Sequence, residues 1–249
     1  MREPKNVKIG NTTLDKIIER HQHWLNADCD GWENMFADLY GADLGSVDLY
    51  GVNLSYADLG ETNLIGASLN NADLHNANLN LSNLENADLR DTNFSHAKIK
   101  NANLSFSDLQ NANLSDTILY NTKLSFANLR DAILNGADFS RVNLSRANLR
   151  GVNLSSVNLN YVDLSGAELT GANLYDASVT GANLDNAIMY GVNLSYANLS
   201  DSILSNANLE GANLYNAIFC DANLSDAILR DANLTKADFS GAILDNIIK

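Results

Sequence analysis

Residues that could carry out chemistry are few in this chain of 249 residues. No serine, cysteine or threonine stands in a recognisable nucleophile–base motif, and no glycine-rich phosphate-binding loop is present. Cys29 and Cys220 are isolated thiols without metal-ligand spacing or a disulfide framework. We therefore predict that the protein is not an enzyme and has no cofactor and no metal site.

A five-residue repeat makes up most of the chain and must position its functional side chains. Starting at Ala37, a unit of the form small–Asx–Leu–x–x recurs 42 times to residue 246 without insertion or deletion. The third position is Leu in 35 units and the first is Ala in 28, while the second is Asn in 20 and Asp in 10. A period of five fits neither a helix nor an uninterrupted strand. Such repetition predicts a solenoid, in which each unit packs on its neighbours.

Each unit reads as a short strand followed by a corner. In an extended segment the small residue and the Leu point to the same side, and the Asx residue points to the other. The last two positions favour Gly, Asn, Asp and Ser, which tolerate turn dihedral angles. We expect coils with Leu and Ala inside, paired as parallel strands, and Asx side chains that hydrogen-bond to the turns.

Residues 37–246 resemble the pentapeptide-repeat family, whose pattern [Ala/Ser/Thr/Val]-[Asp/Asn]-[Leu/Phe]-x-x is seen in Ala57-Asp58-Leu59. The resemblance implies an all-β solenoid, a right-handed four-sided parallel β-helix with twenty residues per coil. On that basis the 42 units make about ten and a half coils. We expect a tail at residues 1–10, a helical cap at 11–36, and a C-terminal tail at 247–249.

The cap segment contains apolar and aromatic residues at helical spacing, with Thr12 or Thr13 as the N-cap. A short capping α-helix over the open first coil would protect its unpaired strand edges. A similar helix precedes the repeats in some bacterial members of the family. The alternative is a partner-binding helix. The residues expected on its apolar face are Leu14, Ile17, Ile18, His21, Trp24 and Leu25.

The opposite end of the repeat lacks comparable protection, because three residues are too few to cover a coil. Exposed strand edges and apolar side chains there are a liability or an association surface. We predict a monomer, or a weak two-fold dimer through this end. The dimer would bury Ile243, Leu244, Ile247 and Ile248.

Twenty residues per coil would align His75, His96 and Asp116 on one face. Imidazoles with a carboxylate can ligate a transition metal. On a rod this polar, however, a chance meeting of exposed side chains is the preferred interpretation.

Phe106, Phe126 and Arg146 would form another column, at an outward corner. Two Phe rings with an Arg predict either a local ladder with cation–π character or the centre of a contact patch. We regard the ladder as the simpler of the two.

Composition limits the partners and the compartment. The formal net charge of −14 argues against direct binding to nucleic acid or to an anionic membrane. No apolar stretch suits a signal peptide or could span a bilayer. Repeated Asn-x-Ser/Thr sequons and two unpaired thiols favour a reducing, non-glycosylating compartment, so we expect a cytoplasmic protein.

The sequence thus predicts a non-enzymatic structural or protein-interaction scaffold whose partner is an unidentified protein. The alternative is an acidic DNA-mimic rod that binds a type II topoisomerase such as DNA gyrase, as some members of the family do. This chain has no loop inserted in the repeats and no long C-terminal segment for a dimer. Its charge over a rod of about 50 Å is also less than half as dense as that of duplex DNA, which carries one charge per about 1.7 Å.

Overall fold

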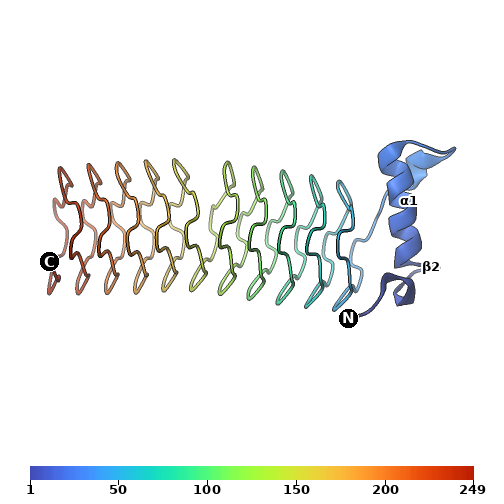
Figure 1. Cartoon of the computed structure of the whole chain (residues 1–249), viewed down its shortest axis with the longest axis horizontal. Helices are drawn as coiled ribbons and strands as arrows, with labels where there is room; N and C mark the ends of the chain where they lie inside the picture. Colours follow the sequence, from blue (N-terminus) through green and yellow to red (C-terminus); the bar gives the residue numbers. More distant parts are fainter.

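The computed structural model describes residues 1–249 as a straight rod with a helical cap at one end (Figure 1). Helices and strands of more than one residue occur only before the repeats. From residue 37 onward the chain alternates turns with isolated parallel bridges that pair residues twenty apart. Four pentapeptides therefore complete one coil, which confirms the predicted four-sided parallel β-helix. The elements of the cap are η1 (Pro4–Asn6), β1 (Lys8–Ile9), β2 (Thr12–Thr13), α1 (Leu14–Asn26) and η2 (Trp32–Asn34).

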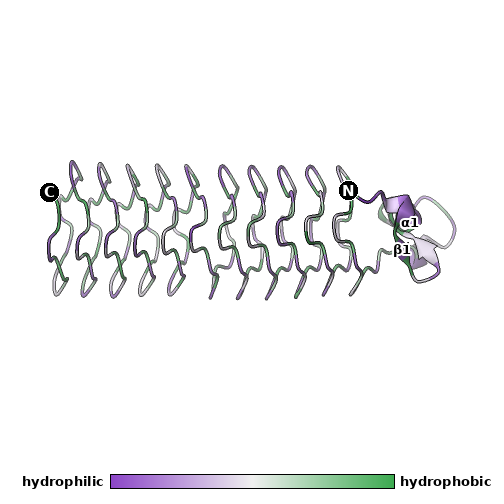
Figure 2. Cartoon of the chain, turned by 90° about the horizontal axis from the view of Figure 1, so that it is seen from below, coloured by the Kyte–Doolittle hydropathy of each residue, from purple (hydrophilic) through white to green (hydrophobic).

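The interior of the rod consists of the Leu and small-residue positions. They form most of one cluster of 71 buried residues, and mid-rod leucines such as Leu104 and Leu144 have no exposed surface. Fully burying such a side chain stabilises the fold by about 1.5–3 kcal/mol. Figure 2 shows the resulting alternation of hydrophobic and hydrophilic residues around every coil.

The Asx residues stabilise the corners and tie neighbouring coils together. Oδ1 of Asp58 accepts the Gly60 N–H at 2.9 Å and also the side-chain amide of Asn78 from the next coil at 2.8 Å. This pattern recurs along the rod, for example at Asp108 with the amide of Asn128 at 2.8 Å. The second position of Asn or Asp is therefore structural, as the sequence indicates.

The cap lies across the open end of the first coil, with α1 running transverse to the rod (Figure 1). His21 is fully buried, and its two ring nitrogens join the helix to the beginning and the end of the first coil. Nδ1 accepts the Ala37 N–H at 3.1 Å, so Nε2 carries the proton and donates to the Ser55 carbonyl at 2.9 Å. Leu14 is also fully buried, whereas Ile17 and Ile18 pack on the core from its margin. Trp24 and Leu25 are half-buried.

Residues 1–10, expected to be a tail, contribute to the rod. Arg2 pairs in parallel with Val47, donating its N–H to the Ser46 carbonyl at 2.7 Å and accepting the Asp48 N–H at 2.8 Å. Val7 is buried, and its carbonyl accepts the N–H of Leu14 at the start of α1. No coil precedes the first coil, so its outer backbone N–H and C=O groups lack a neighbouring strand. Residues 1–10 form hydrogen bonds with some of these groups.

One break interrupts the hydrogen-bond ladder. The bridges expected between Ile133 and Asn153 and between Asp138 and Asn158 are absent, and the N–H groups of Leu134 and Phe139 have no backbone partner. Figures 1 and 2 show the wider gap between two adjacent coils at this point. We call this break the seam and define it by residues 131–142 on one side and 151–163 on the other.

The sequence offers a cause for the seam. Small positions in and beside it hold valine, where alanine is the rule: Val142, Val152, Val157 and Val162. Phe139 also replaces a leucine. Extra volume in a close-packed interior forces the backbone apart. Val152, Phe139 and Val157 lie on the two faces that open, and Val142 and Val162 lie on the adjacent face, which keeps its bridge.

Candidate interaction surface

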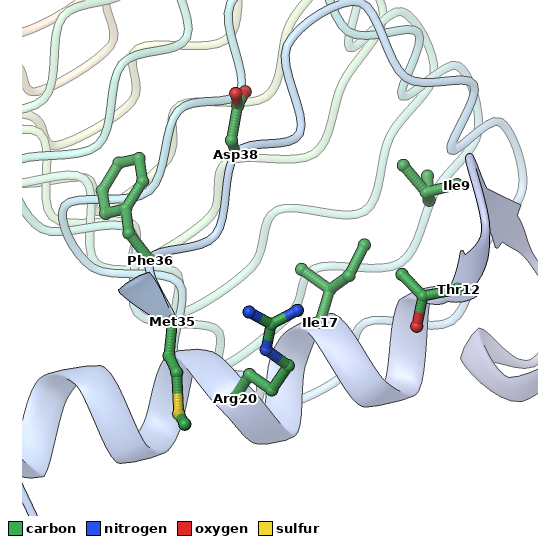
Figure 3. Close-up of a pocket in the computed structure, with 7 residues that line it drawn as sticks. All are labelled: Ile9, Thr12, Ile17, Arg20, Met35, Phe36 and Asp38. Atoms are coloured by element: carbon green, nitrogen blue, oxygen red, sulfur yellow. The ribbon is translucent and has the colours of Figure 1, made fainter. Parts of the chain in front are cut away.

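Leu and Ala side chains fill the interior of the rod. A cavity of about 240 Å³ lies between the cap and the first coil (Figure 3). Arg20 reaches into it from α1, but its guanidinium donates to the Asn34 carbonyl at 3.1 Å. This cavity is a packing crevice without a nucleophile. The residues around it are Ile9, Thr12, Ile17, Arg20, Met35, Phe36 and Asp38.

The side chains available to a partner therefore lie on the corners of the rod. There they point outward and contact their counterparts in the next coil. One corner carries three tyrosines near the C-terminal end. The rings of Tyr175 and Tyr196 are 5.6 Å apart at 63°, and those of Tyr196 and Tyr215 are 5.6 Å apart at 67°. Nζ of Lys236 continues the row, 3.0 Å from the Tyr215 hydroxyl. The hydrogen bond to Lys236 lowers the pKa of Tyr215.

The same corner carries a second aromatic row near the cap. Tyr56 meets His75 edge-on at 5.6 Å, and His75 meets His96 edge-on at 5.3 Å. Trp24 of α1 approaches Tyr56 at 6.1 Å. We call the two rows together the aromatic edge. It comprises Tyr56, His75, His96, Tyr175, Tyr196 and Tyr215.

The sequence placed His75 beside His96, but the tyrosines of the aromatic edge were not predicted, because its members alternate between the two residues of each corner. Within each row their spacing is therefore not twenty, whereas the column of Phe106, Phe126 and Arg146 has that constant spacing. The sequence pattern that would have predicted the aromatic edge is a series of aromatic residues that alternate between the two corner positions in successive coils.

The imidazoles of the aromatic edge are not arranged as metal ligands. Nδ1 of His75 lies 2.8 Å from the Ser95 hydroxyl, and its Nε2 lies 2.6 Å from the Asn76 amide. Both ring nitrogens of His75 are thus engaged. Nε2 of His96 lies 3.9 Å from Oδ2 of Asp116, and both side chains are exposed. The preferred interpretation from the sequence, a local meeting of polar side chains, agrees with these contacts.

The candidate contact patch lies at a different corner. Phe106 and Phe126 stack at 4.8 Å with their planes 11° apart, and the Arg146 guanidinium lies 5.3 Å from the centre of the Phe126 ring. The expected ladder with cation–π character is therefore present. Both rings remain about half exposed, at 51% and 45%, so a partner can still reach them.

The C-terminal end is open. Ile243, Leu244 and Ile248 are exposed, and the N–H groups of Leu234 and Phe239 have no backbone partner. Ile247 packs on the core from its margin, and the end of the rod contains a largely apolar cavity of about 230 Å³. The asymmetry between the two ends matches the expectation from the sequence. Association through this end stays a prediction.

Comparison with known proteins identifies the family. The family model "Pentapeptide repeats (8 copies)" matches residues 35–71, 67–105, 97–136, 137–176, 167–206 and 207–246. The chain belongs to the pentapeptide repeat family. Its right-handed four-sided β-helix is the fold of that family.

Among solved structures, the chain is similar to HetL, a pentapeptide repeat protein involved in heterocyst differentiation regulation from the cyanobacterium Nostoc sp. strain PCC 7120. The identity is 32%, over 90% of this chain and 94% of HetL, with a TM-score of 0.61. QnrB1, a plasmid-mediated fluoroquinolone resistance protein, is 20% identical over 82% of this chain and 94% of its own, with a TM-score of 0.48.

No curated protein matches the sequence. None of the helices is long and apolar enough to cross a membrane.

Proposed function

We propose that this pentapeptide repeat protein is a non-enzymatic scaffold that binds a protein partner through its aromatic edge. The observation that carries the proposal is the row Tyr175, Tyr196 and Tyr215, whose rings meet edge-on along one outward corner of the solenoid. Tyrosine supplies a large contact area at a low cost in conformational entropy, and it is enriched at protein interfaces. A row of such rings on consecutive coils gives a partner a long, preorganised surface.

A binding role also agrees with the rest of the molecule. The cavities on the rod are open and lack converging catalytic groups, whereas enzymes concentrate such groups in a pocket. The similarity to HetL, which is involved in regulation, supports a role in binding rather than turnover. We further propose a cytoplasmic location, with residues 37–246 as one repeat domain and residues 11–36 as its cap.

The test compares two matched triple variants in affinity capture from the native cells. Tyr175→Ser, Tyr196→Ser, Tyr215→Ser removes the C-terminal row of the aromatic edge. Tyr50→Ser, Tyr120→Ser, Tyr190→Ser removes exposed tyrosines from other corners. We expect the first variant to lose the partner that the unmodified protein captures, and the second to keep it. Equal capture by both would contradict the assignment of the edge.

A DNA-mimic rod that binds a type II topoisomerase is the second candidate. It is supported by the unbranched rod and the net charge of −14. Opposing it, the Arg90 guanidinium lies 2.7 Å from Asp88 and 3.8 Å from Asp108, so a cation stands within the most acid-rich face. The aromatic edge therefore has the stronger support.

A further inference from the structure

Three metal-ligating side chains of different types meet where α1 ends. His23 lies in the last turn of the helix, and Asp28 and Cys29 follow it. Ala27 caps the helix in the left-handed conformation, with φ of 50°, and so turns the chain back against that last turn. Nδ1 of His23 lies 2.7 Å from Oδ1 of Asp28. One nitrogen, one oxygen and one sulfur atom of these residues all lie within 4.8 Å of one another.

We propose that His23, Asp28 and Cys29 form a binding site for a divalent transition-metal ion of the zinc type. A mixed nitrogen, oxygen and sulfur set suits Zn²⁺, whereas Mg²⁺ and Ca²⁺ take oxygen ligands. Zinc bonds of 2.0–2.3 Å place the ligand atoms of a tetrahedral ion about 3.3–3.8 Å apart. A small inward movement of a surface turn therefore completes the site.

The surroundings of the cluster favour access by an ion. The side chains of His23 and Asp28 are 42% and 44% exposed, which leaves the fourth position to water. Sδ of Met35 lies 3.8 Å from Sγ of Cys29 and covers the thiol on one side. The net charge of −14 also attracts cations to the molecule.

Metal binding here would have a structural consequence for the cap. The ion would replace the His23–Asp28 hydrogen bond and join the last turn of α1 to the segment that leads through η2 into the first coil. The thiolate of Cys29 would be the sulfur ligand. The site lies away from the C-terminal tyrosine row, and its test does not depend on the proposed partner.

The experiment is a titration of the reduced full-length protein with Co²⁺, a spectroscopic substitute for Zn²⁺. Thiolate coordination gives a sulfur-to-cobalt charge-transfer band, which carboxylate binding does not. We expect the band to saturate at about one equivalent and to be displaced by Zn²⁺. Cys220→Ser, which changes the other thiol at the far end of the rod, is the matched control and should keep the band. Cys29→Ser should abolish it, and His23→Gln should weaken Co²⁺ affinity at least about tenfold, the loss of one ligand.

Two results would overturn the site. Co²⁺ binding without the charge-transfer band would mean adsorption to the acidic surface, and a band retained in Cys29→Ser would assign the thiolate elsewhere. Cys29 is only half-buried and lies outside the core, so the variant should fold, as circular dichroism can verify. A second measurement uses the unmodified thiols. Zn²⁺ should slow alkylation of Cys29 and leave that of Cys220 unchanged.

Discussion

The buried imidazole of His21 accepts a hydrogen bond from the Ala37 N–H at 3.1 Å, at the junction of the cap and the first coil. This bond requires Nδ1 to be unprotonated. Burial lowers the pKa of His21, since the charged ring loses its hydration, although its bond to the Ser55 carbonyl opposes that shift. One side chain therefore makes attachment of the cap depend on pH.

The first prediction follows from this shift. The pKa of His21 is lower in the folded state than in the unfolded chain, so its stabilising effect is complete above the unfolded value of about 6.5. The effect is lost as the pH falls from about 6.5 through the folded pKa. We expect amide exchange in α1 to accelerate over this range while exchange in the mid-rod coils does not change. In His21→Gln the cap should exchange faster at neutral pH and lose this pH dependence. If amide exchange in α1 of the unmodified protein did not accelerate relative to the mid-rod coils over this pH range, the prediction would be contradicted.

The second prediction concerns the interior. Leu144 is fully buried, so Leu144→Asp places a carboxylate where no partner can reach it. Because each coil templates its neighbours, several coils should unfold together, with a loss of at least about 3 kcal/mol. Asn143→Asp, on the outward side of the same unit, is the matched control and should change the stability little. Chemical denaturation followed by circular dichroism measures both variants.

The third prediction tests the DNA-mimic candidate. We expect no effect of micromolar protein on the supercoiling activity of DNA gyrase, because cations interrupt the acidic surface. Inhibition or protection that fell with rising salt would favour that candidate over the aromatic edge. It should then disappear when the acids of the most acid-rich face are neutralised together. Those residues are Asp88, Asp91, Asp108 and Asp131.

The fourth prediction concerns the open end. If two copies associate, they should do so head-on through the C-terminal coil, where Leu244 and Ile248 are exposed. Sedimentation across a concentration series should show a weak monomer–dimer equilibrium, since one coil end buries a small area. Ile247→Lys, Ile248→Lys should abolish it. A protein that stays monomeric at high concentration, or a dimer that the two lysines do not disrupt, would contradict association through the C-terminal coil.

Much of the fold could be predicted from the sequence because the repeat specifies the same local structure in every unit. The position of Leu104 already indicates burial, and that of Asn103 an outward direction. The pairing of Arg2 with Val47 could not be predicted, since an isolated pairing leaves no periodic pattern. The apolar residues Val7 and Ile9 were the only indication that this segment, expected to be a tail, packs on the rod.

The candidate sites were less predictable, because several of their contacts join residues whose spacing is not a multiple of the five-residue repeat. The stack of Phe106 on Phe126 has the spacing of one coil and was found from the sequence. The spacing of Tyr175 and Tyr196 differs from that of one coil by one residue, and their contact was not predicted. The approach of Cys29 to His23 depends on the left-handed turn at Ala27, which has no sequence signature of the kind that glycine provides.

The seam has a consequence for how the rod folds and resists force. In a solenoid, cooperativity is transmitted only by the interface between adjacent coils. The ladder hydrogen bonds are missing on two faces of one such interface, so the coupling there is weaker than at any other coil boundary. Residues before and after the seam should therefore behave as two folding units, and the rod, when stretched along its axis, should part there first.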